Sequence, residues 1–345
     1  MSRLLGDPDD FPRHAPKAQA DDVRTGEELS ATWRTCTEMG AATEIYTDER
    51  RIGIPGGVLD WASYVLGAIT DVRYASWDGA SSTRLVWELV CAGNTRYFLK
   101  ISPTSNCHAR ESHAYRFAVP ALGPLRAPQL MASDPDQLAV LLTAVPGQNV
   151  ATARLTMTDR IKAHRQAGWL LRALHGSAGG SSKIGVDPDA LLMARRRSVE
   201  EHLTAAGELL TPAERELVRR LATLLPLLTS CPTAFIHGDA QDRNLLWDAA
   251  TGSAALLDFE RSQPALAVDD FVRLATGPWA HQPRLRTVFF TGYGRELTRP
   301  EKQVLPALAA LDAVSGLTWG ARNGDDEVID RARVTLKLLN SGAVL

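Results

Sequence analysis

A short polar segment of the chain has residue types and spacing suited to phosphoryl transfer. The segment H-G-D-A-Q-D-R-N spans residues 237–244 after an apolar run, and L-L-D-F-E follows at residues 256–260. A loop of this kind can place the Asp239 carboxylate against a substrate hydroxyl, while Asn244 and Asp258 reach one metal ion from two sides. Mg²⁺ binds few protein oxygens together with phosphate oxygens and water, and one Asn plus one Asp supply them. The alternative is that Asp239 and Asp258 only cap turns.

A second pair of charged residues is conspicuous because lysine is scarce. The chain has 6 lysines among its 38 basic residues, and Lys100 is the only lysine between residues 18 and 161. It ends an otherwise apolar run, where an unpaired ammonium group would be costly. Glu111 is the only acidic residue between 89 and 133, and it lies on a predicted helix. Kinases hold an ammonium group on the α- and β-phosphates with such a strand lysine and helix glutamate. The alternative is a surface ion pair worth under about 1 kcal/mol.

A turn between two predicted strands offers a third and weaker feature. Residues 78–83 read D-G-A-S-S-T, and their backbone amides, with the hydroxyls of Ser81 and Ser82, could cover phosphate groups. The turn has one glycine and lacks the G-x-G-x-x-G pattern of protein kinases. Taken alone, it is better explained as an ordinary hairpin turn.

Hydrophobic periodicity indicates which elements hold these residues. Apolar or alternating runs predict strands, and helical apolar spacing with proline stops predicts helices. The predicted strands cover 71–77, 83–91, 96–101, 138–142, 233–236 and 254–257, and the predicted helices cover 27–39, 106–119, 158–175, 188–209 and 212–228. Strands dominate before Pro146-Gly147 and helices after it. The sequence therefore predicts an α+β fold with a small sheet-rich lobe, a hinge, a larger helical lobe and a cleft between the lobes.

Charge divides the chain further. Residues 1–50 hold 6 basic and 11 acidic residues, a net charge of −5, while the whole chain carries −2. The remainder is therefore +3. We treat 1–50 as an N-terminal extension and 51–145 as the nucleotide-binding lobe. Residues 146–345 form the lobe with the catalytic loop, the metal site and the acceptor-binding region.

Composition excludes several classes of protein. A near-zero net charge leaves no basic footprint for nucleic acid. No run approaches the ~18 apolar residues of a membrane span, and the N-terminus lacks the apolar region of a secretory signal. The four cysteines, Cys36, Cys91, Cys107 and Cys231, are not spaced as a zinc or redox motif. We expect reduced thiols in a cytoplasmic protein with no nucleic-acid or membrane partner.

Together these motifs resemble the aminoglycoside phosphotransferase family and its choline-kinase-like relatives. The H-G-D-x-x-x-x-N loop, the L-L-D-F-E strand end, the F-L-K strand, Glu111 and the L-L-T-A-V-P-G hinge match in order and spacing. The resemblance implies a two-lobed protein-kinase-like fold. It also implies a small-molecule acceptor, because H-G-D and D-F-E replace the H-R-D and D-F-G of protein kinases and no A-P-E follows.

The resemblance assigns roles residue by residue. It implies that Asp239 is the catalytic base or hydroxyl-orienting carboxylate, and that Asn244 and Asp258 are the Mg²⁺ ligands. Lys100, with Glu111 as its partner, is implied as the lysine that binds the phosphates of the donor, ATP or GTP. The remaining nucleotide contacts are implied at Ser81, Ser82 and the backbones of Thr143 and Val145.

Three further residues are expected to support the site. We interpret His175 and His237 as structural residues rather than as acids or bases. Asp270 resembles the buried aspartate that braces the catalytic loop in the family. The alternative for Asp270 is an ordinary helix N-cap.

The acceptor is the least determined part of the prediction. Acidic candidates for binding a polycation are Asp269, Asp312 and residues 325–327, although a solvated helix start explains the last group equally well. Candidates for stacking on a sugar or a base are Trp279, Trp319 and Tyr293, with simple packing as the alternative. The charge of +3 outside the extension favours a neutral or mildly charged hydroxylated acceptor.

The leading hypothesis is a nucleotide-dependent O-phosphotransferase that inactivates an antibiotic, as a self-resistance enzyme. The resemblance leaves an aminoglycoside, a cyclic peptide, a macrolide or a nucleoside as the class of antibiotic. The alternatives are a metabolic kinase for a sugar, choline or homoserine-like compound and a non-catalytic nucleotide-binding module. The oligomeric state and the choice between ATP and GTP stay open.

Overall fold

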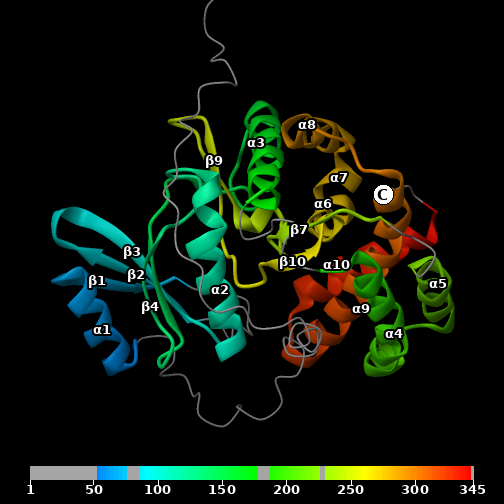
Figure 1. Ribbon diagram of the computed structural model, residues 1–345, viewed down its shortest axis with the longest axis horizontal. Coiled ribbons are helices and arrows are strands. Elements are labelled where there is room, and N and C mark those ends of the chain that lie inside the picture. The colour runs from blue at the N-terminus through cyan, green and yellow to red at the C-terminus, as the bar shows by residue number, and fades with distance from the viewer. Residues whose placement is uncertain (1–52, 76–84, 178–185, 226–229, 343–345) are drawn as a thin grey trace, which may run out of the picture. The chain divides into compact units, whose positions relative to one another are not determined.

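An antiparallel sheet of five strands, in the order β1-β2-β3-β5-β4, builds the first part of the chain (Figure 1). The computed structural model describes residues 53–75, 85–177, 186–225 and 230–342, which all lie within the unit Met39–Leu345. The strands are β1 (Ile69–Tyr74), β2 (Leu85–Cys91), β3 (Thr95–Ile101), β4 (Leu130–Asp134) and β5 (Ala139–Thr143). Two helices, α1 (Gly56–Leu66) and α2 (Ser105–Phe117), accompany the sheet.

Alternation along the strands gives the sheet an apolar face and a face that carries Lys100. Trp87, Leu99 and Leu141 lie opposite one another on three neighbouring strands, and all three are buried in a cluster with residues of α1. Successive side chains of a strand point to opposite faces, so Lys100, which pairs with Val86 on one side, faces away from that cluster. The register of the sheet therefore directs the lysine toward the α2 side.

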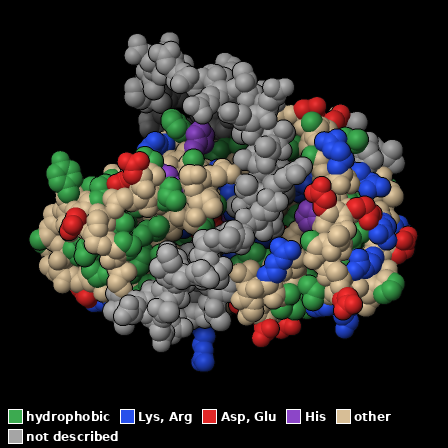
Figure 2. All heavy atoms as spheres, turned by 90° about the horizontal axis from the view of Figure 1, so that it is seen from below, with side chains coloured by type: hydrophobic (Ala, Val, Ile, Leu, Met, Phe, Trp, Pro, Cys, Tyr) green, Lys and Arg blue, Asp and Glu red, His purple; other side chains and the backbone are tan. Residues whose placement is uncertain are grey.

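Helices build most of the remaining chain around one large apolar core. They are α3 (Met157–His175), α4 (Pro188–Ala206), α5 (Pro212–Ala222), α6 (Val272–Thr276), α7 (Pro278–His281), α8 (Pro283–Tyr293), α9 (Arg299–Asn323) and α10 (Asp326–Asn340). In the view of Figure 2, acidic and basic side chains intermingle on the surface of this helical lobe.

The longest helix, α9, is a core helix. It is the one helix of the described ranges that is long and apolar enough to cross a membrane, yet 67% of its apolar stretch is buried inside the protein. Its apolar residues pack against α4, α5 and α10. We therefore interpret its composition as the result of burial on several sides.

Two small sheets connect the lobes and carry the catalytic loop. β6 (Gln148–Asn149), directly after the hinge, pairs with β8 (Leu245–Asp248), which pairs with β9 (Ser253–Leu256). β7 (Thr233–Ile236) pairs with β10 (Gln263–Leu266). The loops that follow β7 and β9 are therefore anchored on both sides by strands.

Helices α3 and α8 cross at unusually close range because glycines meet backbone there. A Cβ atom on Gly168 would lie 2.0 Å from the carbonyl oxygen of Phe289. A Cβ atom on Gly292 would lie 1.8 Å from the carbonyl oxygen of Arg165. Neither position can hold a larger residue unless the helices move apart.

The predicted elements agree with most of the observed ones. The helix predicted over 106–119 is α2, which begins after Thr104, whose side chain accepts a hydrogen bond from the Cys107 N–H at 3.2 Å. The helices predicted over 188–209 and 212–228 end earlier, at Ala206 and Ala222. The helix predicted over 27–39 lies outside the described residues.

Before residue 272, the prediction missed one α-helix and four strands of the described residues, α1, β4, β6, β8 and β10, and it gave no bounds for helices α6–α10. α1 starts with Gly56-Gly57 and has no side-chain cap, so its sequence carries weak helix signals. β10 contains Pro264, which usually argues against a strand. The proline is tolerated because, among the described residues, β10 pairs with β7 alone. The other edge of β10 has no strand partner within those residues, so the lack of a backbone N–H on that edge removes no strand–strand hydrogen bond.

Candidate active site

The loop that carries Asp239 follows β7 and is held by one buried carboxylate. Asp270 accepts hydrogen bonds from the backbone N–H groups of His237 and Gly238, both at 2.7 Å. Gly238 has φ +77°, and a Cβ atom there would lie 2.4 Å from the carbonyl oxygen of Arg261. The conformation and the close approach explain why glycine stands between the histidine and the aspartate.

Asp270 is in turn fixed by His175 from the end of α3. The Nε2 atom of His175 lies 2.9 Å from Asp270 Oδ2, and its Nδ1 atom lies 2.8 Å from the Tyr293 hydroxyl. Burial raises the pKa of Tyr293 to about 12, so the phenol stays protonated and can donate to Nδ1. The short helix Ala267–Phe271 has no side-chain cap. Asp270 therefore braces the loop as the family resemblance implied, and the N-cap alternative is wrong.

His237 has a scaffold position inside the loop. Its ring is fully buried, its Nδ1 atom accepts the Asp239 N–H at 3.3 Å, and its Nε2 atom lies 2.9 Å from the carbonyl oxygen of Leu257. If Nδ1 accepts, then the proton of a neutral imidazole is on Nε2, which donates to Leu257. Both ring nitrogens are used for backbone contacts, in agreement with the structural role expected for His237.

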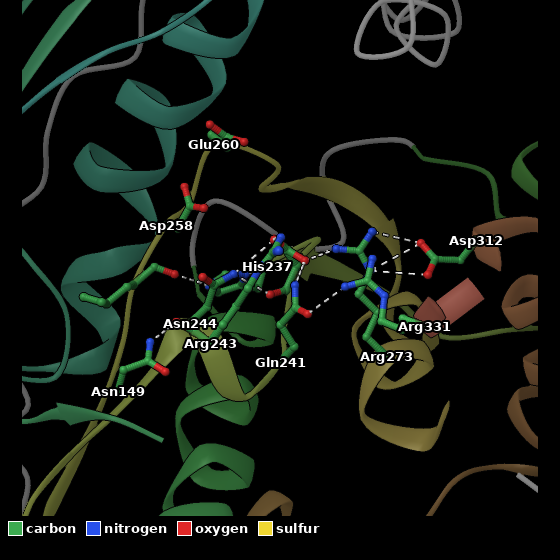
Figure 3. Close-up of polar contacts among 12 residues, drawn as sticks. Asn149, His237, Gln241, Arg243, Asn244, Asp258, Glu260, Arg273, Asp312 and Arg331 are labelled. Atoms are coloured by element: carbon green, nitrogen blue, oxygen red, sulfur yellow. Dashed lines mark hydrogen bonds and ion pairs between the residues drawn. The ribbon is translucent and has the colours of Figure 1, made fainter. Parts of the chain in front are cut away.

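Asp239 accepts hydrogen bonds from four side chains, which are labelled in Figure 3: Gln241, Arg243, Asn244 and Arg273. Its side chain is 1% exposed. One carboxylate oxygen accepts from Arg273 and Gln241, and the other accepts from Arg243 at 3.0 Å and from Asn244 Nδ2 at 3.1 Å. A carboxylate offers about four acceptor positions, so an incoming hydroxyl must replace one of these donors.

Asn244 and Asp258 are brought together by the segment between them. The Leu257 N–H donates to the Asn244 carbonyl oxygen at 2.9 Å, which fixes the residue next to Asp258 against the loop. The Asn244 amide nitrogen donates to the Asp239 carbonyl oxygen at 2.9 Å, so its Oδ1 atom points elsewhere. Asp258 has φ +65°, a strained conformation for a residue other than glycine. An amide oxygen and a carboxylate are a donor set that fits Mg²⁺.

Lys100 lies against three carboxylates. Its Nζ atom is 2.9 Å from Glu111 Oε1, 2.6 Å from Asp258 Oδ1 and 3.1 Å from Glu260 Oε2. The predicted strand–helix pair with Glu111 is therefore present and buried. Burial raises the pKa of Glu111 to about 7, although Lys100 opposes this shift. This cluster holds one positive group against three acidic ones, which suits a divalent cation and donor phosphates.

The hinge residues Thr143 and Val145 lie at the end of β5 and directly after it. The Ala144 N–H between them donates to the Arg96 carbonyl oxygen at 3.3 Å. Along the described backbone, the Val145 N–H makes no hydrogen bond to another backbone group. The expected purine contacts through Thr143 and Val145 stay a prediction. Ser81 and Ser82 lie outside the described residues.

The acidic and aromatic candidates for acceptor binding have other partners. Asp269 is paired with Arg195 at 2.9 Å, and Asp312 is paired with Arg273 at 2.9 Å. Asp325 caps α10 by accepting from the Val328 N–H at 3.0 Å. Trp279 and Tyr293 are buried in an aromatic cluster of the helical lobe, while Trp319 is half-buried on α9. The expectation that Trp279 and Tyr293 stack on an acceptor is therefore wrong, because packing occupies both rings.

Five residues of the site were not predicted as functional: Gln241, Arg243, Glu260, Arg273 and Arg331. The first three lie inside the two acidic motifs, so their positions were visible, but nothing indicated which way they point. Arg273 is one helical turn beyond Asp270, on α6. Arg331 is on α10, far along the chain, and has no local signal that a sequence pattern would reveal.

A strand-borne lysine, a braced H-G-D loop and an Asn–Asp pair, placed between a sheet lobe and a helical lobe, define a kinase-like phosphotransferase. The sequence profile of the phosphotransferase enzyme family, APH, matches residues 71–311, which is more than half of the chain. The chain therefore belongs to this family of phosphotransferase enzymes, and the resemblance drawn from its motifs is confirmed. A search of curated protein sequences finds no match.

Solved structures with the same fold include proteins that act on different antibiotics. The GDP and kanamycin complex of APH(2")-IIia is 15% identical, with a TM-score of 0.61, and covers 83% of this chain and 99% of its own. The macrolide 2'-phosphotransferase MphH from Brachybacterium faecium is 13% identical, with a TM-score of 0.56 and coverage of 82% and 98%. Spectinomycin phosphotransferase APH(9)-Ia, in complex with ADP and spectinomycin, is 15% identical, with a TM-score of 0.53 and coverage of 84% and 95%. These likenesses confirm the predicted two-lobed α+β fold.

Proposed function

We propose that this phosphotransferase moves the γ-phosphate of ATP or GTP to a hydroxyl group of a small-molecule antibiotic. The observation that carries the proposal is the convergence of four side chains from distant segments. Lys100 from β3 contacts Asp258 at 2.6 Å, and Asn244 contacts Asp239 at 3.1 Å. The Leu257 N–H, next to Asp258, donates to the Asn244 carbonyl oxygen at 2.9 Å and links the two pairs through the backbone. This arrangement supports Asp239 as the hydroxyl-orienting carboxylate, Asn244 and Asp258 as metal ligands and Lys100 as the phosphate-binding lysine.

Each group has a distinct task in this mechanism. Asp239 orients the acceptor hydroxyl and takes its proton as the bond from the hydroxyl oxygen to the γ-phosphorus forms and the bond from that phosphorus to the departing nucleoside diphosphate breaks. Lys100 binds the non-transferred phosphates of the donor. The negative charge of these phosphates then compensates the Lys100 ammonium group in place of the surrounding carboxylates. Asn244 and Asp258 would hold Mg²⁺, which when bound offsets negative charge on the phosphate oxygens. The half-buried backbone at Thr143 and Val145 would bind the purine ring.

An antibiotic acceptor is supported by the family and by the structural neighbours. Proteins of the same fold are described with kanamycin, with spectinomycin and as a macrolide phosphotransferase, so this fold accommodates chemically different antibiotics. GDP and ADP complexes among them support a nucleoside triphosphate as the donor. Mass spectrometry of an antibiotic library, incubated with enzyme, Mg²⁺ and either ATP or GTP, tests the proposal through a gain of ~80 Da for one transferred phosphoryl group.

Asp239→Asn is the sharpest test of the catalytic assignment. The amide keeps the shape of the side chain but cannot accept a proton, so kcat should fall by roughly 10²–10⁴. The nucleotide affinity, measured by calorimetry, should stay near that of the original enzyme. Asp248→Asn is the matched control, because Asp248 caps a turn at the end of β8 through Ala250 and Thr251. Undiminished turnover by Asp239→Asn would contradict the assignment.

A further inference from the structure

Four arginines gather around Asp239 and Asp312: Arg243 and Arg273 pair with Asp239, and Arg261, Arg273 and Arg331 act electrostatically on Asp312. We call Arg243, Arg261, Arg273 and Arg331 the arginine cluster. Its members come from the catalytic loop, the segment after Asp258, α6 and α10. In Figure 3, Asp258 and Glu260 lie to one side of the catalytic loop, while Arg273, Arg331 and Asp312 lie to the other.

The two sides of the loop carry opposite charge. Around Lys100, one ammonium group faces the three carboxylic groups of Glu111, Asp258 and Glu260. In the arginine cluster, four guanidinium groups face the two carboxylates of Asp239 and Asp312. The side near Lys100 therefore attracts a cation, and the side of the arginine cluster attracts an anion.

Arg273 is neutralised inside the cluster. It bridges Asp239 and Asp312, and its Nη2 atom lies 2.9 Å from Asp312 Oδ1. Burial alone would lower the pKa of Arg273, but the two carboxylates outweigh burial and hold it above its usual range. We therefore interpret Arg273 as a positioning residue that fixes the orientation of the catalytic carboxylate.

The same two carboxylates compensate Arg331 less than they compensate Arg273. Its side chain is half-buried, and its Nη1 atom donates a single long hydrogen bond of 3.3 Å to the Gln241 side-chain oxygen. Within the described ranges of the chain, no carboxylate forms an ion pair with Arg331. Burial and the neighbouring Arg273 lower the pKa of its guanidinium group, and the opposing effects of Asp312 and Asp239 do not outweigh them. A guanidinium group that is partly removed from water and makes no ion pair is unfavourable, and an anionic ligand would relieve that cost.

Resting on the proposed phosphotransferase function, we propose that the acceptor carries an anionic group beside its reactive hydroxyl, and that Arg331 binds this group. The contact with Gln241, which also donates to Asp239, places Arg331 one residue away from the catalytic carboxylate. The planar guanidinium fork matches the two oxygens of a carboxylate or a phosphate ester. A polycationic acceptor would instead meet four arginines, so the cluster also acts as an element of specificity.

The test compares acceptors that differ in charge alone. The full-length enzyme is saturated with Mg²⁺ and a non-hydrolysable nucleotide, so that donor phosphate sites are filled. Matched hydroxylated ligands are then titrated by calorimetry: glucuronate against glucose, uridine 5′-monophosphate against uridine, and kanamycin as the polycation. We expect the anionic member of at least one pair to bind at least about tenfold more tightly than its neutral partner, which is the preference a charged-group contact produces.

Variants assign the preference to one residue. Arg331→Gln should lose at least about tenfold in affinity for the anionic ligand, while Arg331→Lys, which keeps the charge without the fork, should lose less. Arg333→Gln is the matched control, because Arg333 lies on the same helix and pairs with Glu214 at 3.4 Å. Unfolding temperatures of all three variants check that the fold is kept.

The outcomes separate this inference from the proposed function. Equal affinity for charged and neutral members, tighter binding of kanamycin, or unchanged anion affinity in Arg331→Gln would each overturn the inference. Absence of binding by both anions would overturn it as well. A rise in nucleotide KM alone in Arg331→Gln would assign Arg331 to the donor phosphates instead and also overturn it. In all these cases phosphorylation of another acceptor, lost in Asp239→Asn, would leave the proposed function intact.

Discussion

Lys100 and its three acidic neighbours show how single residues prepare this site for ligands. Glu111 is fully buried on α2, and its contact with Lys100 at 2.9 Å holds the ammonium group on the α2 side of the sheet. Asp258 and Glu260 hold the same group from the loop after β9. Burial, together with the neighbouring Asp258 and Glu260, raises the pKa of Glu111 to about 7. A proton on Glu111 then relieves part of the repulsion among the three acidic groups around Lys100.

This raised pKa predicts how stability depends on pH. Between the ordinary glutamate pKa of 4.5 and the folded value of about 7, the unfolded chain loses the Glu111 proton while the folded protein keeps it. The folded state then binds more protons, so the stabilisation is complete below pH 4.5 and is lost as the pH rises through 7. Relative to Glu111→Gln, the original protein should become less stable over that range. Urea unfolding at a series of pH values, without metal or nucleotide, measures the difference.

An exposed carboxylate gives the control for this measurement. The hydrogen bond from Arg219 lowers the pKa of Glu200, so its contribution is lost as the pH falls. The stability difference between the original protein and Glu200→Gln should therefore stay constant between pH 4.5 and 7 and decrease only as the pH falls below 4.5. A difference for Glu111→Gln that stays constant across the range would contradict the protonation of Glu111 near neutral pH.

Among the secondary-structure elements, the crossing of α3 and α8 positions the residues behind the catalytic loop. α3 ends at His175 and α8 ends at Tyr293, and the His175 side chain contacts both Tyr293 and Asp270. Gly168 and Gly292 set the distance between the two helices. The distance between α3 and α8 therefore determines where His175 and Tyr293 lie, and through His175 it affects the position of Asp270, which holds the catalytic loop.

Gly292→Ala should weaken this crossing. A methyl group 1.8 Å from the Arg165 carbonyl oxygen must push the helices apart, which costs about 1–3 kcal/mol or more. Gly316→Ala on α9 is the matched control, because its methyl group would meet Val328 at 3.5 Å, an ordinary contact. That control should gain up to about 1 kcal/mol from its better helix propensity. Chemical denaturation measures both, and equal stability of the two variants would show that the crossing is not tightly packed.

The sequence predicted elements and motifs better than the contacts among them. Lys100 and Glu111 stood out through rarity, and Asp239, Asn244 and Asp258 through spacing, so the nucleotide side of the site could be predicted. The arrangement of arginines on the acceptor side could not, because Arg331 comes from a helix near the C-terminus and reaches the site only through tertiary packing. Similarly, β10 was missed because Pro264 argues against a strand, whereas the equally short β7 and β9 were predicted from their apolar runs.

Across the whole molecule, the catalytic loop separates a side rich in acidic groups from a side rich in arginines. The net charge of −2 conceals this, because acidic and basic groups balance over the chain and intermingle on its surface (Figure 2). The acidic group at Lys100 draws on β3, α2 and the loop after β9, while the arginine cluster draws on α6 and α10. Transfer of a phosphoryl group from the first side to the second requires that the sheet lobe and the helical lobe keep their relative positions.

Binding of nucleotide with Mg²⁺ should therefore stabilise the protein as one unit. A ligand at a hundred times its dissociation constant adds about 2.7 kcal/mol to the free energy of unfolding, so the unfolding temperature should rise in a single transition. Removing the metal with EDTA should abolish most of that rise, since Asn244 and Asp258 then act without the cation that joins them to the phosphates. Asp258→Asn should reproduce the effect of EDTA, while Asp248→Asn, whose side chain caps a turn, should respond as the original protein does. A nucleotide shift that is unchanged by EDTA and by Asp258→Asn would show that the donor binds without a metal at this pair.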